Sequence, residues 1–170
     1  MILIGIGSNL AASGYSSAQE TGEAATAALL GIGVALRARS SWYASEPVPV
    51  SDQPWFVNAV AEVATELPPA ELLARLLVLE LRFGRQRSVR DAARTLDLDL
   101  LDYDRLQCAT PELVLPHPRL HVRRFVLMPL SEIAPTWRHP RLGLTAAELL
   151  AQLPPGQAIR RLANPNVAPG

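Results

Sequence analysis

The order of strand-like and helix-like segments constrains the fold of this chain more than any other feature of its sequence. Strands are indicated by β-branched or alternating apolar runs between turn residues, and helices by apolar residues at i, i+3 and i+4 spacing. The segments lie at residues 1–7, 18–30, 35–47, 55–67, 68–84 and 93–104. Their order of strand, helix, strand, strand, helix, strand predicts an α+β protein, a ferredoxin-like α/β sandwich in which helices pack on one face of an antiparallel sheet.

The connections between these segments give further expectations. The loop Pro47 to Pro54 separates the second and third strand-like segments, which predicts a long antiparallel hairpin with a flexible tip. Glycines at the end of the first segment, MILIGIG, indicate that this buried strand runs into a turn. Two more helices are expected at about residues 123–130 and 145–153. We expect a single domain over residues 1–170, with a loosely held tail at about 155–170.

The charges of this chain balance, with 16 basic residues against 16 acidic ones. Such a chain lacks the overall charge of a general nucleic-acid binder or of a protein that binds anionic membranes, so neither partner is expected. Every basic residue is an arginine, which excludes mechanisms that need a lysine amine. The single cysteine, Cys108, cannot form an internal disulfide, and no apolar run reaches about 18 residues. We therefore expect a cytoplasmic protein in which Cys108 is a small buried residue.

Two aspartates, Asp97 and Asp99, interrupt an apolar run in the last strand-like segment. On a strand, residues two apart leave the same face about 6.5 to 7 Å from each other along the chain. Two buried, unpaired carboxylates would be costly, whereas a magnesium ion typically takes one or two protein carboxylates together with substrate phosphates. The pair therefore indicates either a magnesium site or a solvent-facing strip whose neighbouring leucines face the core.

Arginines crowd the segment just before this aspartate pair. They lie in the last turn of the preceding helix and in the loop that follows it, at Arg82, Arg85, Arg87, Arg90 and Arg94. Guanidinium groups bind phosphate oxygens with two hydrogen bonds, and Gly84 can act as a hinge for the loop, so the combination indicates a polyphosphate substrate. A solvated charged loop is the alternative explanation of the arginines alone.

Six segments resemble, in their order and spacing, the 6-hydroxymethyl-7,8-dihydropterin pyrophosphokinases of folate biosynthesis. They are GIGSNL, DQPWFVNAV, LELRFGRQR, RTLDLDLL, LPHPRL and RRFVLMPLSEIAP, and the resemblance extends from residue 1 to about residue 135. The combination of RTLDLDLL with LPHPRL is its most specific part. The resemblance implies an ATP-dependent diphosphotransferase, which transfers diphosphate from ATP to the hydroxymethyl group of 6-hydroxymethyl-7,8-dihydropterin and releases AMP.

The resemblance also implies which residues act on ATP. Asp97 and Asp99 match the metal-binding aspartates of the family and would hold two magnesium ions that bridge the phosphates, in agreement with two-metal catalysis of in-line displacement. Arg85 and Arg94 match loop arginines that steady the transferred diphosphate, so they count as catalytic residues with the aspartates. The implied ATP contacts are Glu80, Arg87, His117 and Arg123.

For the pterin, the implied contacts are Ser45, Val48, Phe56, Asn58 and Phe125. The two phenylalanines would sandwich the flat ring, and the Asn58 amide can supply a donor and an acceptor to its edge. Without the resemblance, simpler roles are expected. These are a structural residue between prolines for His117, core residues for Phe56 and Phe125, a strand-edge residue for Asn58 and an exposed helix residue for Glu80.

Three features depart from the pattern of the family. The tripeptide Asp91–Ala93 stands before Arg94 where the family often has Trp-Gly-Pro, and the loop is about one residue shorter, so its closure is expected to differ. Leu77 stands where a polar residue near the nucleotide is common, which puts ATP affinity in question. Phe56 stands where tyrosine also occurs, which preserves stacking and loses a hydroxyl group.

Two other functions stay open on the residues alone. A magnesium-dependent nucleotide hydrolase would use the same aspartates on water and would release AMP and diphosphate without pterin. A non-catalytic ferredoxin-like module would use the arginine-rich loop to bind an anionic ligand. If the family function holds, the partners are ATP and the pterin, a monomer is expected, and a functional link to dihydropteroate synthase is one further expectation.

Overall fold

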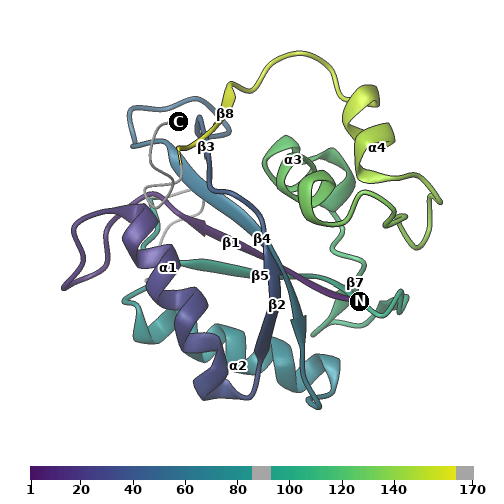
Figure 1. Cartoon of the computed structure of the whole chain (residues 1–170), viewed down its shortest axis with the longest axis horizontal. Coiled ribbons are helices and arrows are strands. Elements are labelled where there is room, and N and C mark those ends of the chain that lie inside the picture. Colours follow the sequence, from purple (N-terminus) through teal and green to yellow (C-terminus); the bar gives the residue numbers. More distant parts are fainter. Residues whose placement is uncertain (86–92, 164–170) are drawn as a thin grey trace.

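Six strands of the computed structural model, which describes residues 1–85 and 93–163, form one antiparallel sheet (Figure 1). Along the sheet the order is β5 (Asp97–Tyr103), β1 (Ile2–Ser8), β4 (Phe56–Ala64), β3 (Tyr43–Ser45) and β8 (Ile159–Arg161), and β2 (Ala35–Arg39) also pairs with β4. Two short strands, β6 (Cys108–Ala109) and β7 (Val114–Leu115), form a separate pair. The predicted α+β class with an antiparallel sheet is confirmed.

The helices lie close to where the sequence predicts them. They are α1 (Ala18–Ala28), α2 (Pro69–Arg82), α3 (Arg124–Ile133) and α4 (Ala146–Gln152), with 3₁₀ turns at η1 (Leu29–Ile32) and η2 (Leu120–Val122). Side chains cap two of them: Ser17 accepts the N–H of Glu20 in α1, and Thr145 forms a capping box with Glu148 in α4. Within the described residues, no helix combines the length and the apolar character that crossing a lipid bilayer requires.

Helices cover both faces of the sheet, whereas the sequence predicted them on one face (Figure 1). On one face, Ile2, Ile4 and Ile6 of β1 pack with buried residues of α1 and α2. On the other face, Leu3 of β1 and Leu101 of β5 pack with buried residues of α3 and α4. The one-face prediction was wrong because these strands are apolar on both sides, and such a strand needs a covering layer on each face.

The segment at residues 35–47, predicted as one strand, is divided in two. Ser40 lies between β2 and β3. Its N–H donates to Val60 O (2.9 Å), and its hydroxyl oxygen accepts the N–H of Val60 (3.0 Å). The side chain thus replaces a backbone carbonyl in the ladder, and Trp42 beyond it is buried in the core. The predicted hairpin is confirmed, because β2 and β3 both pair antiparallel with β4.

Part of the tail that was expected to be loosely held belongs to the sheet. Strand β8 pairs antiparallel with β3, so that Ile159 lies opposite Ser45. The N–H of Leu162 also donates to Trp42 O (2.8 Å). A segment near the C-terminal end of the described chain is therefore fixed beside β3.

Candidate active site

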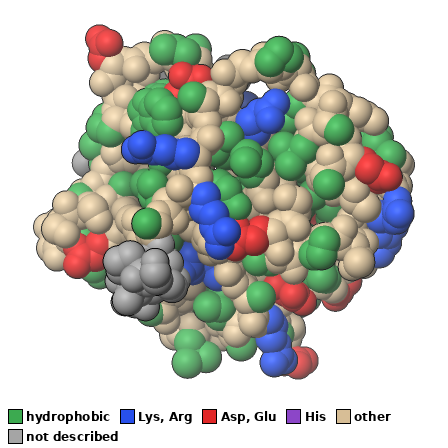
Figure 2. Space-filling view, turned by 45° about the horizontal axis from the view of Figure 1, so that its top comes forward, with side chains coloured by type: hydrophobic (Ala, Val, Ile, Leu, Met, Phe, Trp, Pro, Cys, Tyr) green, Lys and Arg blue, Asp and Glu red, His purple; other side chains and the backbone are tan. Residues whose placement is uncertain are grey.

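One cavity of about 310 Å³ opens on the sheet face that carries α3. Strands β1, β3, β4 and β5 contribute to its lining, together with the segment from η2 to the start of α3. Nine predicted site residues line it: Ser45, Val48, Phe56, Asn58, Arg94, Asp97, Asp99, Arg123 and Phe125. The predicted metal ligands and the predicted pterin contacts therefore share one space. In Figure 2, arginine and acidic side chains lie next to each other near the middle of one face, with apolar side chains close by.

Glycines of β1 make room for this cavity. The sequence predicted a turn at these glycines, but β1 continues to Ser8, and Gly5 and Gly7 lie inside the strand. Both line the cavity, on the opposite face from Ile4. A Cβ atom at Gly7 would lie 3.1 Å from Asn58 Oδ1, so a larger residue would press on that amide. Glycine inside a strand signals such a close approach and could have been used as a clue to the site.

Arginine side chains donate hydrogen bonds to both carboxylate oxygens of Asp97. Arg85 Nη1 donates to Oδ1, and Arg94 Nη1 donates to Oδ2 (2.7 Å). Burial raises the pKa of Asp97, but the positive charges and hydrogen bonds of the two guanidinium groups outweigh burial and hold this pKa below its ordinary value. Asp97 is therefore ionised at neutral pH.

The negative charge of Asp99 is less well balanced by nearby arginines than that of Asp97. Arg123 Nη1 lies 3.4 Å from its Oδ2, which is long for a hydrogen bond between charged groups. Burial and the negative charge of Asp97 raise the pKa of Asp99 to about 6, although Arg123 acts in the opposite direction. A divalent cation next to this carboxylate would supply the missing positive charge.

The aspartate pair fits a magnesium ion that takes its remaining ligands from water and phosphates. Asp97 and Asp99 both line the cavity, and carboxylate oxygen is a donor that magnesium prefers. Within residues 1–85 and 93–163, no group of three or more His, Cys, Asp or Glu side chains could hold a metal. An ion at the pair would therefore depend on a phosphate substrate and water to complete its coordination.

Glu80 is buried rather than an exposed helix residue. It is 1% exposed, and its Oε1 accepts the N–H of Leu98 (2.8 Å) and Arg85 Nη1 (3.1 Å). Glu80 thus links α2 to β5 and orients the guanidinium group that binds Asp97. Neither Glu80 nor Arg85 is among the described residues that line the cavity. The burial of Glu80 could have been predicted from the sequence, because Glu80 stands four residues after Leu76 on the apolar stripe of α2.

His117 lies next to the cavity but is not among the described residues of its lining. Its Nδ1 accepts the N–H of Arg119 (3.1 Å), and its backbone N–H donates to Leu101 O on β5 (2.8 Å). Burial and the positive charges of Arg123 and Arg119 lower the pKa of His117 to about 4, so the ring is neutral at pH 7 with its proton on Nε2.

Arg119 lines the cavity and was not predicted as a site residue. Its side chain makes no hydrogen bond or ion pair within the described residues, so its five donors can serve a ligand. The signal was present, because Arg119 belongs to LPHPRL, a segment that carries the family resemblance.

Amide and aromatic side chains line the cavity beside β3. Asn58 Nδ2 donates to Ser45 Oγ (2.8 Å), and both side chains are buried. Phe56 lies opposite Ser45 in the strand register, and Phe125 follows the first residue of α3. The guanidinium group of Arg123 lies 5.4 Å from the centre of the Phe125 ring. Ring faces next to an amide are what a flat nitrogen heterocycle requires.

Asn9 joins two loops at the cavity and was also missed. Its Oδ1 accepts the N–H of Arg94 (2.6 Å), and its Nδ2 donates to Gln53 Oε1 (2.8 Å) and Pro54 O (3.1 Å). Asn9 is 3% exposed, so its polar atoms depend on these protein partners. Three other polar residues of the lining were not predicted as site residues: Glu46, Gln53 and Gln157. Gln53 belongs to DQPWFVNAV, a segment that carries the family resemblance, whereas Glu46 and Gln157 lie outside all six segments.

Some sequence expectations fall outside the described chain. Arg87, a predicted ATP contact, lies within residues 86–92, as do Arg90 and the first two residues of the Asp91–Ala93 tripeptide. Leu77, the apolar departure from the family pattern, is half-buried in α2 and is not among the described residues that line the cavity.

Comparison with known proteins bears on this site. Residues 3–135 match the model of the 7,8-dihydro-6-hydroxymethylpterin-pyrophosphokinase (HPPK) family. A 2-amino-4-hydroxy-6-hydroxymethyldihydropteridine pyrophosphokinase of Synechocystis is 42% identical over 121 residues, which are 71% of this chain and 62% of the relative. The protein of the same name from Pseudomonas aeruginosa is 44% identical over 119 residues, which are 70% of this chain and 73% of the relative.

A third relative is a much longer protein. The mitochondrial folate synthesis bifunctional protein of Arabidopsis thaliana is 41% identical over 101 residues, which are 59% of this chain and 18% of the relative. The aligned part of this chain thus spans less than two thirds of the Synechocystis relative and less than a fifth of the Arabidopsis one. The resemblance seen in the motifs is confirmed, and the chain belongs to the 7,8-dihydro-6-hydroxymethylpterin-pyrophosphokinase family.

Proposed function

We propose that this chain catalyses the reaction for which its family is named. It transfers diphosphate from ATP to the hydroxymethyl group of 6-hydroxymethyl-7,8-dihydropterin and releases AMP, within folate biosynthesis. One observation carries the proposal: a carboxylate pair with arginines, suited to a polyphosphate, lines the same cavity as two phenylalanines and an amide, suited to a flat heterocycle. The names of the relatives support the same activity.

Asp97 and Asp99 are the proposed ligands of two magnesium ions. Ions at this pair would neutralise charge on the triphosphate and favour in-line attack on its β-phosphorus. Both oxygens of Asp97 already accept hydrogen bonds, so Arg85 and Arg94 must share or release them when a metal-bound nucleotide enters. We infer that, when the nucleotide binds, the aspartates turn from the arginines to the magnesium ions. The guanidinium groups then turn from the Asp97 carboxylate to the phosphates.

The arginines would then stabilise the group that is transferred. Arg94 and Arg123 line the cavity, and Arg85 reaches Asp97 from the end of α2. Guanidinium groups that bind the transferred diphosphate would stabilise the negative charge that develops on it during the reaction. Arg119 adds a positive charge to the same cavity lining.

Three residues complete the proposed ATP site: Glu80, Arg87 and His117. Glu80 would act through the Arg85 guanidinium group, which it orients. The neutral ring of His117 would donate its Nε2 proton to an acceptor of the nucleotide. The role of Arg87, which lies outside the described residues, stands on the family resemblance alone.

The pterin is proposed to bind beside β3, in contact with Ser45, Val48, Phe56, Asn58 and Phe125. The phenylalanine rings would enclose the flat heterocycle. Because the Asn58 amino group already donates to Ser45 Oγ, its Oδ1 is the atom that would accept an N–H from the pterin edge.

Partners and location are also proposals. The Arabidopsis relative is named as a bifunctional protein of folate synthesis, which supports a functional link between this chain and another folate enzyme. We propose dihydropteroate synthase as that enzyme, a monomer as the working form and the cytoplasm as the location.

A nucleotide assay tests the proposed function. The protein is incubated with ATP and magnesium, with and without 6-hydroxymethyl-7,8-dihydropterin, and AMP and free diphosphate are measured. AMP that appears only with the pterin is the expected result. Release of AMP and diphosphate without pterin would replace the proposal with nucleotide hydrolysis, and absence of any turnover would leave only binding of an anionic ligand.

A further inference from the structure

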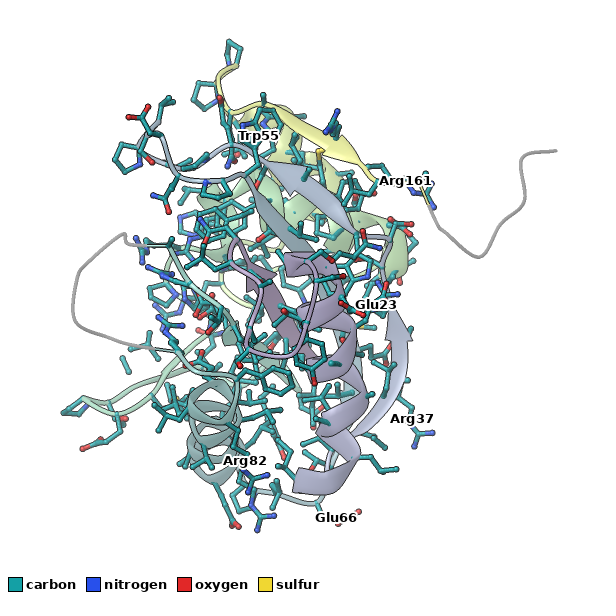
Figure 3. All side chains as sticks on the ribbon, turned by 90° about the vertical axis from the view of Figure 1, so that its left-hand side faces the viewer. Glu23, Arg37, Trp55, Glu66, Arg82 and Arg161 are labelled. Atoms are coloured by element: carbon teal, nitrogen blue, oxygen red, sulfur yellow. The ribbon has the colours of Figure 1, made fainter. Side chains whose placement is uncertain are left out.

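The segment Gln157–Arg161 lies beyond residues 3–135, which match the family, and yet it borders the cavity. Gln157 belongs to the cavity lining, and β8 follows it directly beside β3. In Figure 3, Trp55 and Arg161 lie at this end of the molecule, away from Arg82 at the end of α2. The C-terminal part of the described chain therefore contributes to the site.

A backbone carbonyl fixes the orientation of the Gln157 amide. Its Nε2 donates to Glu46 O (2.9 Å), and because a carbonyl oxygen can only accept, the amide must place its amino group there. The other end of the amide, Oε1, makes no hydrogen bond within the described residues. Since Gln157 is half-buried in the cavity wall, this oxygen can accept a hydrogen bond from a bound molecule.

The backbone next to Gln157 is held by contacts with Glu46. The N–H of Ala158 donates to Glu46 Oε1 (2.7 Å), and the N–H of Glu46 donates to Ala158 O (3.1 Å). The guanidinium group of Arg160 also lies 5.9 Å from the centre of a Trp55 ring, at the end of the loop between β3 and β4. A side chain anchored in this way loses little further freedom on binding, which favours a specific contact.

Ser45 of β3 lies between β8 and Asn58. It lies opposite Ile159 on β8, and its Oγ accepts Asn58 Nδ2 (2.8 Å). Asn58 therefore also has its amino group bound to protein, and its Oδ1 lies on the side of Gly7 in the cavity wall. Two amide oxygens from residues that line one cavity suit a heterocycle whose edge carries N–H groups.

We propose that Gln157 is a specificity-determining residue whose Oε1 accepts an N–H group from the edge of the heterocyclic substrate. The inference rests on the proposed function, because the dihydropterin ring supplies the N–H groups. A ring with a methylated nitrogen at that position loses the hydrogen bond, and the acceptor of Gln157 is left without a partner.

The test compares Gln157→Met, which keeps the length of the side chain and removes the amide, with the matched control Gln152→Met at the exposed end of α4. Calorimetry measures the Kd of 6-hydroxymethyl-7,8-dihydropterin with magnesium and α,β-methylene-ATP, in which the bond to be broken is replaced. Loss of one hydrogen bond is expected to weaken pterin binding about tenfold in Gln157→Met. The nucleotide Kd of both variants should stay within about twofold of wild type, which also shows that they fold.

Methylated pterins separate direct contact from an indirect effect. Analogues that carry one methyl group at each ring N–H in turn are measured on wild type and Gln157→Met. In wild type, methylation of the nitrogen that donates to Gln157 removes this hydrogen bond, whereas in Gln157→Met the hydrogen bond is already absent. For that analogue, the loss of affinity on methylation should therefore be about tenfold smaller in the variant than in wild type, which is the coupling expected of a direct contact. Equal losses in both proteins for every analogue, or a wild-type pterin Kd in Gln157→Met, would overturn the role of Gln157 and leave the proposed function intact. No pterin binding by wild type would overturn both.

Discussion

Gly7 of β1 and Asn58 of β4 are so close that a Cβ atom at Gly7 would lie 3.1 Å from Asn58 Oδ1. An alanine here needs the amide to move by a few tenths of an ångström, which disturbs both its hydrogen bond to Ser45 and the acceptor proposed for the pterin. We expect Gly7→Ala to raise the pterin Kd about tenfold and to leave the nucleotide Kd unchanged, as measured by calorimetry.

Gly5→Ala is the matched control for this change. Gly5 lies on the same strand and lines the same cavity, but a Cβ atom there would make ordinary contacts of 3.6 Å with Leu101 and 3.8 Å with Asp99 Cβ. It should weaken pterin binding less than Gly7→Ala does. An equal or larger effect from Gly5→Ala would show that cavity volume, rather than the position of Asn58, determines the affinity.

Removal of either carboxylate charge should abolish most of the turnover. Asp97→Asn and Asp99→Asn each keep the side-chain shape and remove a proposed magnesium ligand. We expect the turnover at saturating magnesium to fall at least about a hundredfold in each, a loss of about 2.7 kcal/mol of transition-state stabilisation. The control is Asp104→Asn, since Asp104 is exposed and pairs with the N-terminal amino group (2.6 Å). Turnover within tenfold of wild type in either site variant would contradict the metal assignment.

Glu132 gives the protein a pH-dependent contribution to stability. Its carboxylate accepts hydrogen bonds from Tyr43 OH (2.7 Å) and from the N–H of Ser41 (2.9 Å). Burial raises the pKa of Glu132, but these hydrogen bonds outweigh burial and lower it overall. A lowered pKa means that the stabilisation is fully present above the ordinary glutamate pKa of about 4.3 and is lost as the pH falls through the folded value.

The variant Glu132→Gln tests this contribution. Because the carboxylate is partly exposed, we expect a loss of about 1 kcal/mol in the free energy of unfolding at pH 7. The difference from wild type should be smaller at pH 3 than at pH 7, because the stabilisation is lost as the pH falls through the folded pKa of Glu132. Urea unfolding at the two pH values measures it, with Glu66→Gln as the control, because Glu66 is exposed at the opposite end of the molecule (Figure 3). A difference that does not change with pH would contradict the role of the charge.

Gly22 tests the packing of α1 against the sheet. A Cβ atom at Gly22 would lie 2.5 Å from the Trp42 ring, which is buried in the core. Alanine normally favours a helix, but here the clash should dominate, and Gly22→Ala should lower the free energy of unfolding by about 1 to 3 kcal/mol. Gly31→Ala, where no atom lies within 4 Å of the new Cβ, should change it by less than about 1 kcal/mol. Denaturant unfolding of both variants gives the comparison.

The fold could be predicted from sequence wherever the signal is local. Alanine content and end residues located α1, apolar spacing and end residues located α2, and alternation located β4 and β5. Helices α3 and α4 were also predicted close to their observed positions. Strand β8 could not be found in this way, because it has three residues and exists only through its pairing with β3, more than a hundred residues earlier. The second helical layer was missed for a different reason, because the prediction did not use the apolar character of both strand faces, which requires a covering layer on each.

The site shows the same division between local and tertiary signals. The aspartate pair and Phe56 belong to motifs with a characteristic spacing, and the cavity brings them together. The Arg85 contact of Asp97 depends on where α2 ends relative to β5, which no spacing within the sequence specifies. The Arg94 contact is local, because Arg94 stands three residues before Asp97. Gln157 reaches the cavity only because β8 pairs with β3, so no motif could have indicated it.

The most direct test of the central claim is the balance of products from ATP and 6-hydroxymethyl-7,8-dihydropterin with magnesium. Mass spectrometry identifies the pterin product, and chromatography counts AMP against it. Diphosphate transfer predicts a pterin that carries two phosphorus atoms, formed in a one-to-one ratio with AMP. A pterin with a single phosphate and ADP, or AMP with an unmodified pterin, would contradict it.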